Sequence, residues 1–404
     1  MDNWRDSKIE ELCTLHYGKS PRGIDSDDGI YPIYGTGGIV GSTNDYLYDK
    51  PSIILGRKGS IGNIHYVDKP FWTIDTTFYV EAKNCDTKWL YYVFSSLNIE
   101  KLNEATGVPS LSRNNIYAQM LKAPSDQKEQ QKIAEILSTV DKKINLIAQK
   151  IAETEKLKTG LMQKLFSEGI GVQDENGDWQ PHSEFQDSPF GKIPQLWSTL
   201  ELAEIADIED GDRGKSYPKQ ADFSDFGYCL FLSAKNVTKQ GFTYETTQFI
   251  SQEKHNKLRK GQVLQNDIVL TTRGTVGNFG LFKHEELFDA VRINSGMAII
   301  RCIDSSMPNY LYQFMQSPQF KAQISKVVFG SAQPQLTIKQ IKKFKVLVPT
   351  SEEKKWIEET LKLANDKLTL LEQQKAETQQ LKKGLMQKLL TGEWRVPVEE
   401  TEAA

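Results

Sequence analysis

Apolar residues recur every three or four positions over two long stretches of the chain. From position 133 onward their spacing is 4-3-4-3-4, which is typical of a helix that buries a narrow stripe against another helix. This first stripe consists of Ile133, Leu137, Val140, Ile144, Ile147 and Ile151. We expect it to change phase and continue through Leu157, Leu161 and Leu165. Ser125 is expected to cap the start of the helix.

The second stretch repeats the first at a separation of 224 residues. Its stripe consists of Ile357, Leu361, Ala364, Leu368 and Leu371, followed by Leu381, Leu385 and Leu389. The segments "LKTGLMQKL" (157–165) and "LKKGLMQKL" (381–389) are identical at eight of nine positions and contain Met162 and Met386. Ser351 is the expected cap of this helix.

The repetition also includes the regions that precede the two helices. Trp4 and Gly18 align with Trp197 and Gly211, and "KGSIGN" (58–63) aligns with "RGTVGN" (273–278). The segment 108–124 aligns with 332–349 through shared proline, leucine and isoleucine positions. Because the blocks follow the same order, the chain reads as two versions of a globule followed by a long helix.

Short β-rich runs such as "SIILG" and "GMAIIRC" alternate with helical patches such as "TKWLYYVFSSLN" and "MPNYLYQFMQS". The sequence therefore predicts an α+β protein with two mixed globules and an internal pseudo-two-fold repeat. The two helices should form an antiparallel coiled coil, since each offers the other a comparable stripe. The alternative is that each helix packs on its own globule. The expected boundaries are 1–124 (first globule), 125–168 (helix), 169–193 (linker), 194–350 (second globule), 351–391 (helix) and 392–404 (acidic tail).

Charge is distributed unevenly along the chain, whose net charge is −3. Eight acidic residues lie in the two segments 171–191 and 399–402, which contain no lysine or arginine, so the remaining residues are net positive. Residues 321–349 contain six lysines and no acid, which is compatible with a local basic surface. The four cysteines and five histidines lack metal-ligand spacing, so neither a disulfide framework nor structural zinc is expected. The sequence shows neither a membrane-spanning run nor a signal-peptide core, which predicts a cytoplasmic protein.

Motifs of the common enzyme classes are missing from the sequence. "GDRGKS" (211–216) ends like a phosphate-binding loop, but its first glycine is too close to the lysine. The signatures of serine hydrolases, zinc proteases and kinases do not occur. We therefore expect a binding protein without catalytic, cofactor-binding or metal-binding residues of its own.

Two glycine-containing segments and the two loops before the helices carry side chains suited to DNA. Arginine and lysine can contact phosphates or guanine edges, asparagine and glutamine can address adenine, and glycine lets the backbone approach closely. Either glycine segment could instead be a tight hairpin turn, and either loop could simply pack beneath a helix start. The candidate contacts are Arg57, Lys58, Ser60, Asn63, Arg113, Asn114, Arg273, Thr275, Asn278, Gln333, Gln335, Lys339 and Lys343.

The order of globule, "GLMQKLF" helix, "FQDSPFGKIPQLW" linker, second globule and "GLMQKLLTGEWRV" helix resembles the specificity subunit of type I restriction–modification enzymes. The resemblance covers nearly the whole chain. It implies two target-recognition domains that each read half of a split double-stranded DNA site, and a coiled coil that docks two DNA methyltransferase (modification) subunits.

The same resemblance implies that restriction subunits join through the modification core. S-adenosylmethionine, ATP and Mg would belong to those partners, and the specificity subunit would catalyse nothing. The residues expected in the coiled coil and its docking surface are Ile133, Leu137, Val140, Ile144, Leu161, Met162, Ile357, Leu361, Leu368, Leu385 and Met386.

Two other classes of protein remain open at this point. The chain could be a non-catalytic interaction scaffold whose coiled coil separates two ligand-binding globules. It could also be a DNA methyltransferase or nuclease fused to a reader, although the N/D-P-P-Y/F tetrapeptide of adenine methyltransferases does not occur in it.

Overall fold

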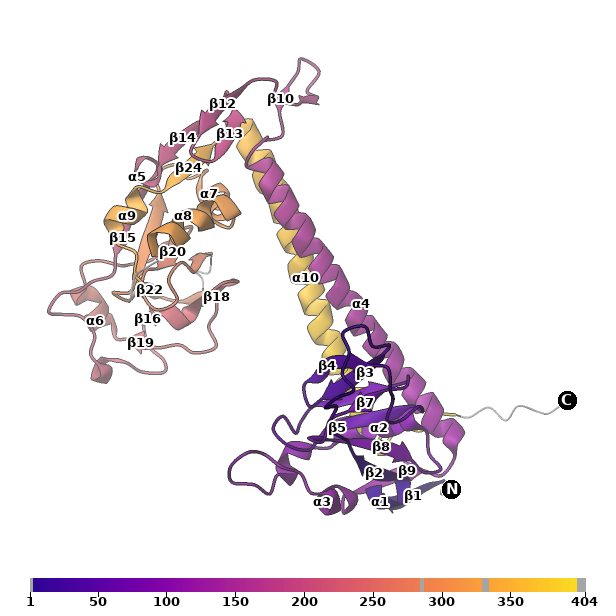
Figure 1. Cartoon of the computed structure of the whole chain (residues 1–404). Helices are drawn as coiled ribbons and strands as arrows, with labels where there is room; N and C mark the ends of the chain where they lie inside the picture. Colours follow the sequence, from indigo (N-terminus) through magenta and orange to yellow (C-terminus); the bar gives the residue numbers. More distant parts are fainter. Residues whose placement is uncertain (1–2, 284–286, 329–333, 398–404) are drawn as a thin grey trace. The chain divides into compact units, whose positions relative to one another are not determined.

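The computed structural model describes residues 3–283, 287–328 and 334–397. The chain divides into two compact units, of which the first comprises Met1–Lys150 with Leu371–Ala404 and the second Ile151–Leu370. Each unit therefore contains one globule together with part of each long helix (Figure 1). We describe each unit by itself.

The first globule is built on a four-stranded antiparallel sheet in the order β2-β8-β5-β6. A smaller sheet has the order β4-β3-β7, with β3 parallel to β7, and β1 pairs with β9. The strands are β1 (Trp4–Lys8), β2 (Cys13–Tyr17), β3 (Tyr31–Gly35), β4 (Gly38–Thr43), β5 (Ser52–Gly56), β6 (Ile64–Val67), β7 (Trp72–Thr73), β8 (Thr77–Ala82) and β9 (Met120–Pro124). The helices are α1 (Ile9–Leu12), α2 (Thr87–Ser96), the 3-10 helix η1 (Ile99–Leu102) and α3 (Arg113–Tyr117).

The second globule has the same plan with additional elements. Its four-stranded sheet has the order β15-β23-β20-β21, a three-stranded sheet has the order β19-β16-β22, and β14 pairs with β24. The strands of these sheets are β14 (Ser198–Glu201), β15 (Ala206–Asp210), β16 (Cys229–Leu232), β19 (Phe249–Ile250), β20 (Ile268–Thr271), β21 (Phe279–Leu281), β22 (Ala290–Ile293), β23 (Met297–Cys302) and β24 (Lys345–Val348). The helices are α5 (Leu202–Ile205), η2 (Gln220–Asp222), η3 (Ala234–Asn236), α6 (Gln252–Lys257), α7 (Pro308–Met315), α8 (Pro318–Val328) and α9 (Ile338–Lys342).

Three two-stranded hairpins complete the second unit. One lies within the second globule and two lie in the segment that precedes it. These hairpins are β17–β18 (Val237–Thr238 and Gly241–Phe242), β10–β11 (Val172–Gln173 and Trp179–Gln180) and β12–β13 (Phe185–Ser188 and Gly191–Pro194).

The two globules repeat one topology. In each globule, the strand that follows the first short helix (β2 or β15) lies at one edge of the four-stranded sheet. Its neighbour is the strand of that sheet that comes last in the sequence (β8 or β23). Each smaller sheet joins one antiparallel and one parallel neighbour to its central strand. The predicted α+β class and the internal repeat are both confirmed, as are the two predicted helical patches, which form α2 and α7.

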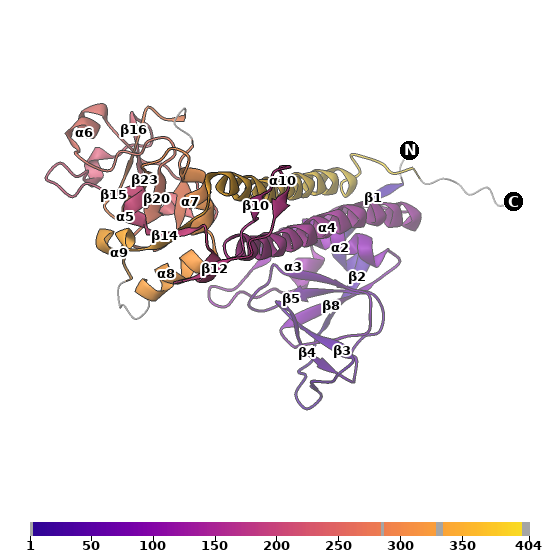
Figure 2. The same ribbon diagram turned by 90° about the horizontal axis from the view of Figure 1, so that it is seen from above.

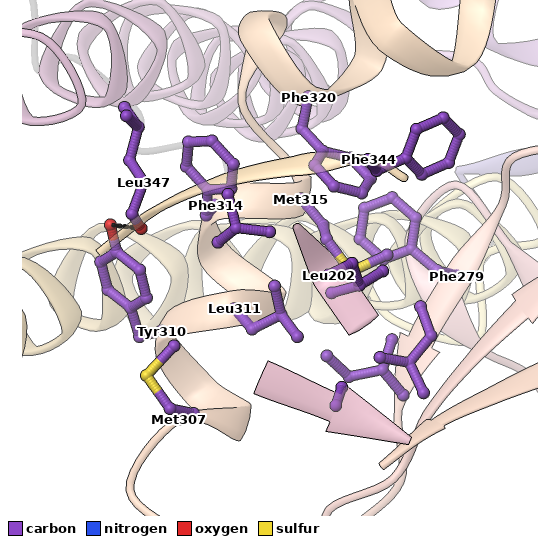
Figure 3. Packing of buried hydrophobic residues seen from close by; sticks show 14 of the residues in the cluster. Leu202, Phe279, Met307, Tyr310, Leu311, Phe314, Met315, Phe320, Phe344 and Leu347 are labelled. Atoms are coloured by element: carbon purple, nitrogen blue, oxygen red, sulfur yellow. Dashed lines mark hydrogen bonds between the residues drawn. The ribbon is translucent and has the colours of Figure 1, made fainter. Parts of the chain in front are cut away.

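The core of the second globule forms where α7 and α8 cover its sheet (Figure 3). Phe314 contacts Phe320 with ring centroids 5.9 Å apart, and Phe320 contacts Phe344 at 5.5 Å. Tyr310 is fully buried, and its hydroxyl donates a hydrogen bond of 2.8 Å to the carbonyl of Leu347 in β24. Burial of these aromatic side chains stabilises the globule that carries the loops described below.

The two long helices, α4 (Gln127–Leu165) and α10 (Ser351–Leu389), contain 39 residues each. In the first unit the start of α4 and the end of α10 share one core, which includes Leu137 and Leu389. In the second unit the end of α4 and the start of α10 share another, which includes Leu165 and Leu361. The helices are therefore antiparallel, as predicted, and both views show them side by side (Figures 1 and 2).

The predicted change of phase in the helix stripe is wrong. Leu157 is 61% exposed and its counterpart Leu381 is 53% exposed, so neither lies in the stripe. The 4-3 spacing instead continues without interruption through Thr154 and Lys158 in α4 and through Thr378 and Lys382 in α10. The prediction followed the apolar leucines, whereas the observed stripe contains polar residues at 154, 158, 378 and 382.

Nine of the predicted coiled-coil residues lie in the stripe, and Met162 and Met386 lie beside it. Five are buried, namely Ile133, Leu137, Met162, Ile357 and Leu361. The others are half-buried, namely Val140, Ile144, Leu161, Leu368, Leu385 and Met386.

The residue that caps each long helix lies one position away from the predicted cap. The amide of Lys128 donates to Asp126 Oδ1 at 2.8 Å, and the amide of Glu353 donates to Thr350 Oγ1 at 3.4 Å. Ser125 and Ser351 are therefore not the capping residues. The true caps, Asp126 and Thr350, are again separated by 224 positions, so the repetition includes the helix starts.

Candidate nucleic-acid interface

The glycine-containing segment of the first globule is the loop of the β5–β6 hairpin, residues 57–63. The amides of Arg57 and Lys58 donate to the carbonyl of Thr76 at 2.9 and 3.1 Å. Gly59 has a φ of +82°, a conformation that favours glycine. The hairpin reading of this segment is thus correct, and the turn presents Lys58, Ser60 and Asn63 as exposed side chains.

The loop before α3 is bonded directly to this hairpin. The amide of Leu111 donates to the carbonyl of Arg57 at 2.9 Å, and the amide of Gly59 donates to the carbonyl of Pro109 at 2.9 Å. Leu111 is buried and anchors the segment in the core. Two sequence segments that were predicted separately therefore form one surface.

Helix α3 starts at Arg113 because Ser112 caps it, accepting a hydrogen bond of 3.2 Å from the amide of Asn115. Ile116 is buried and holds the helix against the globule. Asn114 is exposed on the first turn. The side chain of Asn115 hydrogen-bonds Glu104, so it is engaged inside this surface.

Arg57 and Arg113 converge on the ring of Tyr17, the last residue of β2. The guanidinium carbon of Arg57 lies 5.0 Å from the Tyr17 ring centroid, and that of Arg113 lies 4.3 Å from it. Arg57 also lies 5.9 Å from the ring of Phe78, the cross-strand neighbour of Tyr17. Tyr17 is 49% exposed. We did not predict Tyr17 as a site residue; its only sequence signal is an aromatic residue immediately before a glycine turn.

The second globule places its corresponding segment in the β20–β21 hairpin. The amide of Leu336 donates to the carbonyl of Thr272 at 3.0 Å, which repeats the bond between Leu111 and Arg57. Arg273 and Thr275 are exposed. Asn278 is half-buried, and its amide nitrogen donates to the carbonyl of Val237 at 3.1 Å. Its donor end is therefore used within the globule.

The loop before α9 carries the remaining candidates of the second globule. Thr337 caps α9, accepting a hydrogen bond of 3.3 Å from the amide of Gln340. Gln335, Lys339 and Lys343 are exposed around this short helix, while Gln333 lies outside the described residues. Thr337 aligns with Ser112, so both repeats use a capped short helix beside the hairpin loop.

The part of both surfaces that the structure describes contains neither a cluster of metal-ligating side chains nor a thiol of lowered pKa. Over the described ranges no group of histidine, cysteine, aspartate or glutamate side chains could hold a metal ion. The four cysteines are free, and burial raises the pKa of the Cys13, Cys229 and Cys302 thiols to about 12. Within the same part of the chain no helix combines the length and apolar character needed to cross a bilayer.

Two copies of one sheet topology, each presenting a glycine hairpin beside a capped short helix, define a duplicated α+β binding protein. The chain belongs to the family described as the type I restriction modification DNA specificity domain, whose family model matches residues 1–156 and 194–380. It is therefore a DNA specificity subunit of a type I restriction–modification system, which is a non-catalytic component. This assignment replaces the scaffold and fused-enzyme alternatives.

Individual relatives agree with the family assignment. The chain is 26% identical to the type I restriction enzyme MjaVIII specificity subunit of Methanocaldococcus jannaschii, over 98% of this chain and 94% of the relative. Its fold is similar to the crystal structure of the type I restriction–modification S subunit from M. genitalium, with a TM-score of 0.61, 19% identity and 96% of each chain covered. A chain from a structural study of complex assembly and conformational transition in the type I R-M system has a TM-score of 0.56, 14% identity and coverage of 97% and 98%.

Proposed function

We propose that residues 1–124 and 194–350 are two target-recognition domains, each of which reads one half of a gapped, asymmetric double-stranded DNA site. The observation that carries this proposal is the pairing of hairpin loop and capped helix in both repeats with different side chains. The first repeat presents Arg57, Lys58 and Arg113, whereas the second presents Arg273, Gln335 and Lys339. One scaffold with two sets of polar contacts suits two different half-sites.

The long helices act as the spacer between the two readers. At ~1.5 Å per residue, 39 helical residues span roughly 60 Å. An uninterrupted 4-3 stripe keeps both helices in one register along this length, which is what a spacer of fixed length requires.

The nine-residue segment that occurs twice, at 157–165 and 381–389, docks two DNA methyltransferase (modification) subunits, one on each copy. Leu157 and Leu381 support this proposal because both are large, exposed and outside the stripe. In the first unit a groove of about 990 Å³ lies along the same stretch of α10. Its lining includes Ser95, Met120, Lys383, Met386 and Leu390.

Restriction subunits join through the modification core, and the assembly works in the cytoplasm. S-adenosylmethionine, ATP and Mg serve the partner subunits. The solved structure described for complex assembly of the type I R-M system supports assembly with other subunits, because this chain shares its fold.

A single-molecule map of methylated bases in the host genome tests this function. With the gene intact, the map should contain one gapped, asymmetric motif that disappears when the gene is deleted. Exchange of residues 1–124 for the reader of a relative should change one half of the motif, and exchange of 194–350 should change the other half. A map that is the same with and without the gene, or an exchange that alters both halves, would contradict the proposal.

A further inference from the structure

The first globule holds two arginines whose charges are not neutralised by the protein. Over the described ranges neither Arg57 nor Arg113 forms an ion pair or a side-chain hydrogen bond, and the Nε atoms of both are shielded from solvent without a hydrogen-bond partner. Two other arginines that are buried or half-buried have hydrogen-bond partners: Arg292 donates to His255 Nδ1 and to the carbonyls of Leu258 and Lys260, and Arg301 is paired with a carboxylate. Arg301 donates to Asp267 at 2.6 and 2.8 Å.

A shared aromatic ring gives these two arginines a defined orientation. Both lie close to the ring of Tyr17, at 5.0 and 4.3 Å. The backbone of Arg57 is fixed by Thr76 and Leu111, and Arg113 is fixed by the capped start of α3. Stacking of this kind limits the planes that a guanidinium can adopt, so its donors point in set directions.

Such a pair calls for a ligand with adjacent hydrogen-bond acceptors. In DNA these are the O6 and N7 atoms of guanine in the major groove or the oxygens of a phosphate. A phosphate needs charge more than orientation, and the exposed Lys58 on the same loop already provides that charge. An oriented fork is more useful against a flat base edge.

Comparison of the two repeats favours the base edge. The place of Tyr17 at the end of its strand is taken in the second globule by Asp210, which pairs with Lys260 at 3.3 Å and with Arg213 at 3.8 Å. In the alignment of the repeats, Arg57 corresponds to Thr272, which is buried, and Arg113 to Ile338. Phosphate contacts are independent of sequence and would suit both repeats equally, whereas a base contact must differ between unequal half-sites.

We propose that Arg57 and Arg113, oriented by Tyr17, read guanine in the half-site of the first globule. This inference rests on the proposed function, because it names the base class that one of its two readers recognises. Tyr17 is a positioning residue, and the two guanidiniums make the contact.

The test uses the full chain with its modification subunits, and short duplexes that carry the mapped motif. Guanines of the first half-site are replaced singly by 7-deazaguanine, which removes the N7 acceptor and leaves base pairing intact. We expect at least one replacement to weaken binding by about tenfold or more. In Arg57→Gln or Arg113→Gln the unmodified duplex should lose a similar factor, and the matching replacement should cost nothing further.

Conservative variants separate the base from the phosphate and from misfolding. Arg57→Lys keeps the charge but loses the planar fork, so replacing the matching guanine by 7-deazaguanine should cost it less affinity than it costs the unaltered chain. Tyr17→Phe should preserve recognition, whereas Tyr17→Ala should weaken discrimination against 7-deazaguanine. Arg5→Gln, at an exposed position of β1, is the matched control and should behave as the unaltered chain.

Three results would overturn the inference. Equal loss by the glutamine variants on guanine and 7-deazaguanine duplexes alike, with a smaller salt dependence, would assign the arginines to phosphates. A first half-site without guanine on either strand would overturn the inference while leaving the proposed function intact. A methylation map that does not depend on the gene would overturn both.

Discussion

At the residue scale, each unit contains one buried glutamate, at matched positions of the two repeats, that binds segments of its own unit to one another. Glu353 has a fully buried side chain and accepts hydrogen bonds from Trp197 Nε1 at 2.6 Å and from the amides of Ile170 and Gly171 at 2.7 and 3.2 Å. Its counterpart Glu129 accepts two bonds from Arg395, at 2.8 and 2.9 Å. In each unit the segment that leaves one long helix is thereby fixed to the start of the other.

Glu353→Gln should destabilise the second unit. The new amide group would place a donor against Trp197 Nε1 or against the amides of the linker, so one buried donor would lose its acceptor. We expect a loss of about 1–3 kcal/mol in the free energy of unfolding, measured by urea denaturation. Glu359→Gln, an exposed site on the same helix, is the control and should change the value by less than about 0.5 kcal/mol. Equal effects of the two changes would refute the role of Glu353.

The pair in the first unit should depend on pH. Burial alone would raise the pKa of Glu129, but the two hydrogen bonds from Arg395 and the charge of that arginine hold the pKa below its usual value. A lowered pKa stabilises the fold above the pKa of the unfolded chain, about 4.3 for glutamate, and this contribution is lost as the pH falls through the folded value.

Arg395→Met should therefore cost most at neutral pH. Because Arg395 is half exposed, we expect about 1–2 kcal/mol at pH 7, with a difference that shrinks as the medium is acidified below about pH 4.3. Urea denaturation of both chains between pH 7 and pH 3.5 measures this. A difference that grows on acidification would show that the ion pair is not its source.

At the scale of elements, the coiled coil combines an unbroken stripe with polar positions inside it. Lys382 lies in the stripe and pairs with Asp141 of α4 at 2.6 Å, and Tyr92 of α2 donates to the same carboxylate at 2.8 Å. Polar groups at such positions fix the register of paired helices at some cost in stability. Leu157 and Leu381 lie outside the stripe and are exposed.

Replacing the two exposed leucines should separate folding from docking. Leu157→Ser and Leu381→Ser should each change the free energy of unfolding by less than about 0.5 kcal/mol, whereas Leu137→Ala should cost about 2–5 kcal/mol because its side chain is fully buried. Each serine variant should reduce the number of bound modification subunits from two to one, measured by native mass spectrometry. Leu146→Ser and Leu370→Ser, exposed sites on the same helices, are the controls and should keep both subunits.

At the scale of the whole molecule, helix length should determine the gap in the DNA site. The Asp141–Lys382 pair gives the register of the two helices, so residues 143–149 and 374–380 form matched seven-residue segments. Deleting both removes one heptad from each helix and preserves the 4-3 spacing. At ~1.5 Å per residue the spacer shortens by ~10 Å, which corresponds to about three base pairs at ~3.4 Å each.

The methylation map of the shortened protein should show the same half-sites with a gap about three base pairs smaller. Deletion of four residues from each helix is the control: it breaks the spacing of the stripe and should destabilise the coiled coil. An unchanged gap in the heptad deletion would refute the spacer role of the helices.

The sequence by itself determined the features that follow from local periodicity and from repetition. The heptad spacing predicted two long helices, and the matched blocks predicted two globules of one design, since equal patterns of apolar residues bury equal faces. The hairpin reading of residues 57–63 was available because glycine alone readily adopts a positive φ at Gly59.

Tertiary structure decided what depends on contacts between distant segments. The sequence predicted Leu157 in the stripe because leucine is apolar. In the structure the side of α4 that packs is the one that carries Thr154 and Lys158, which are half-buried, whereas Leu157 is exposed. Likewise the meeting of Arg57 and Arg113 on Tyr17 joins three segments far apart in the chain. Their proximity arises from strand order and backbone hydrogen bonds of the folded globule, which local sequence patterns do not encode.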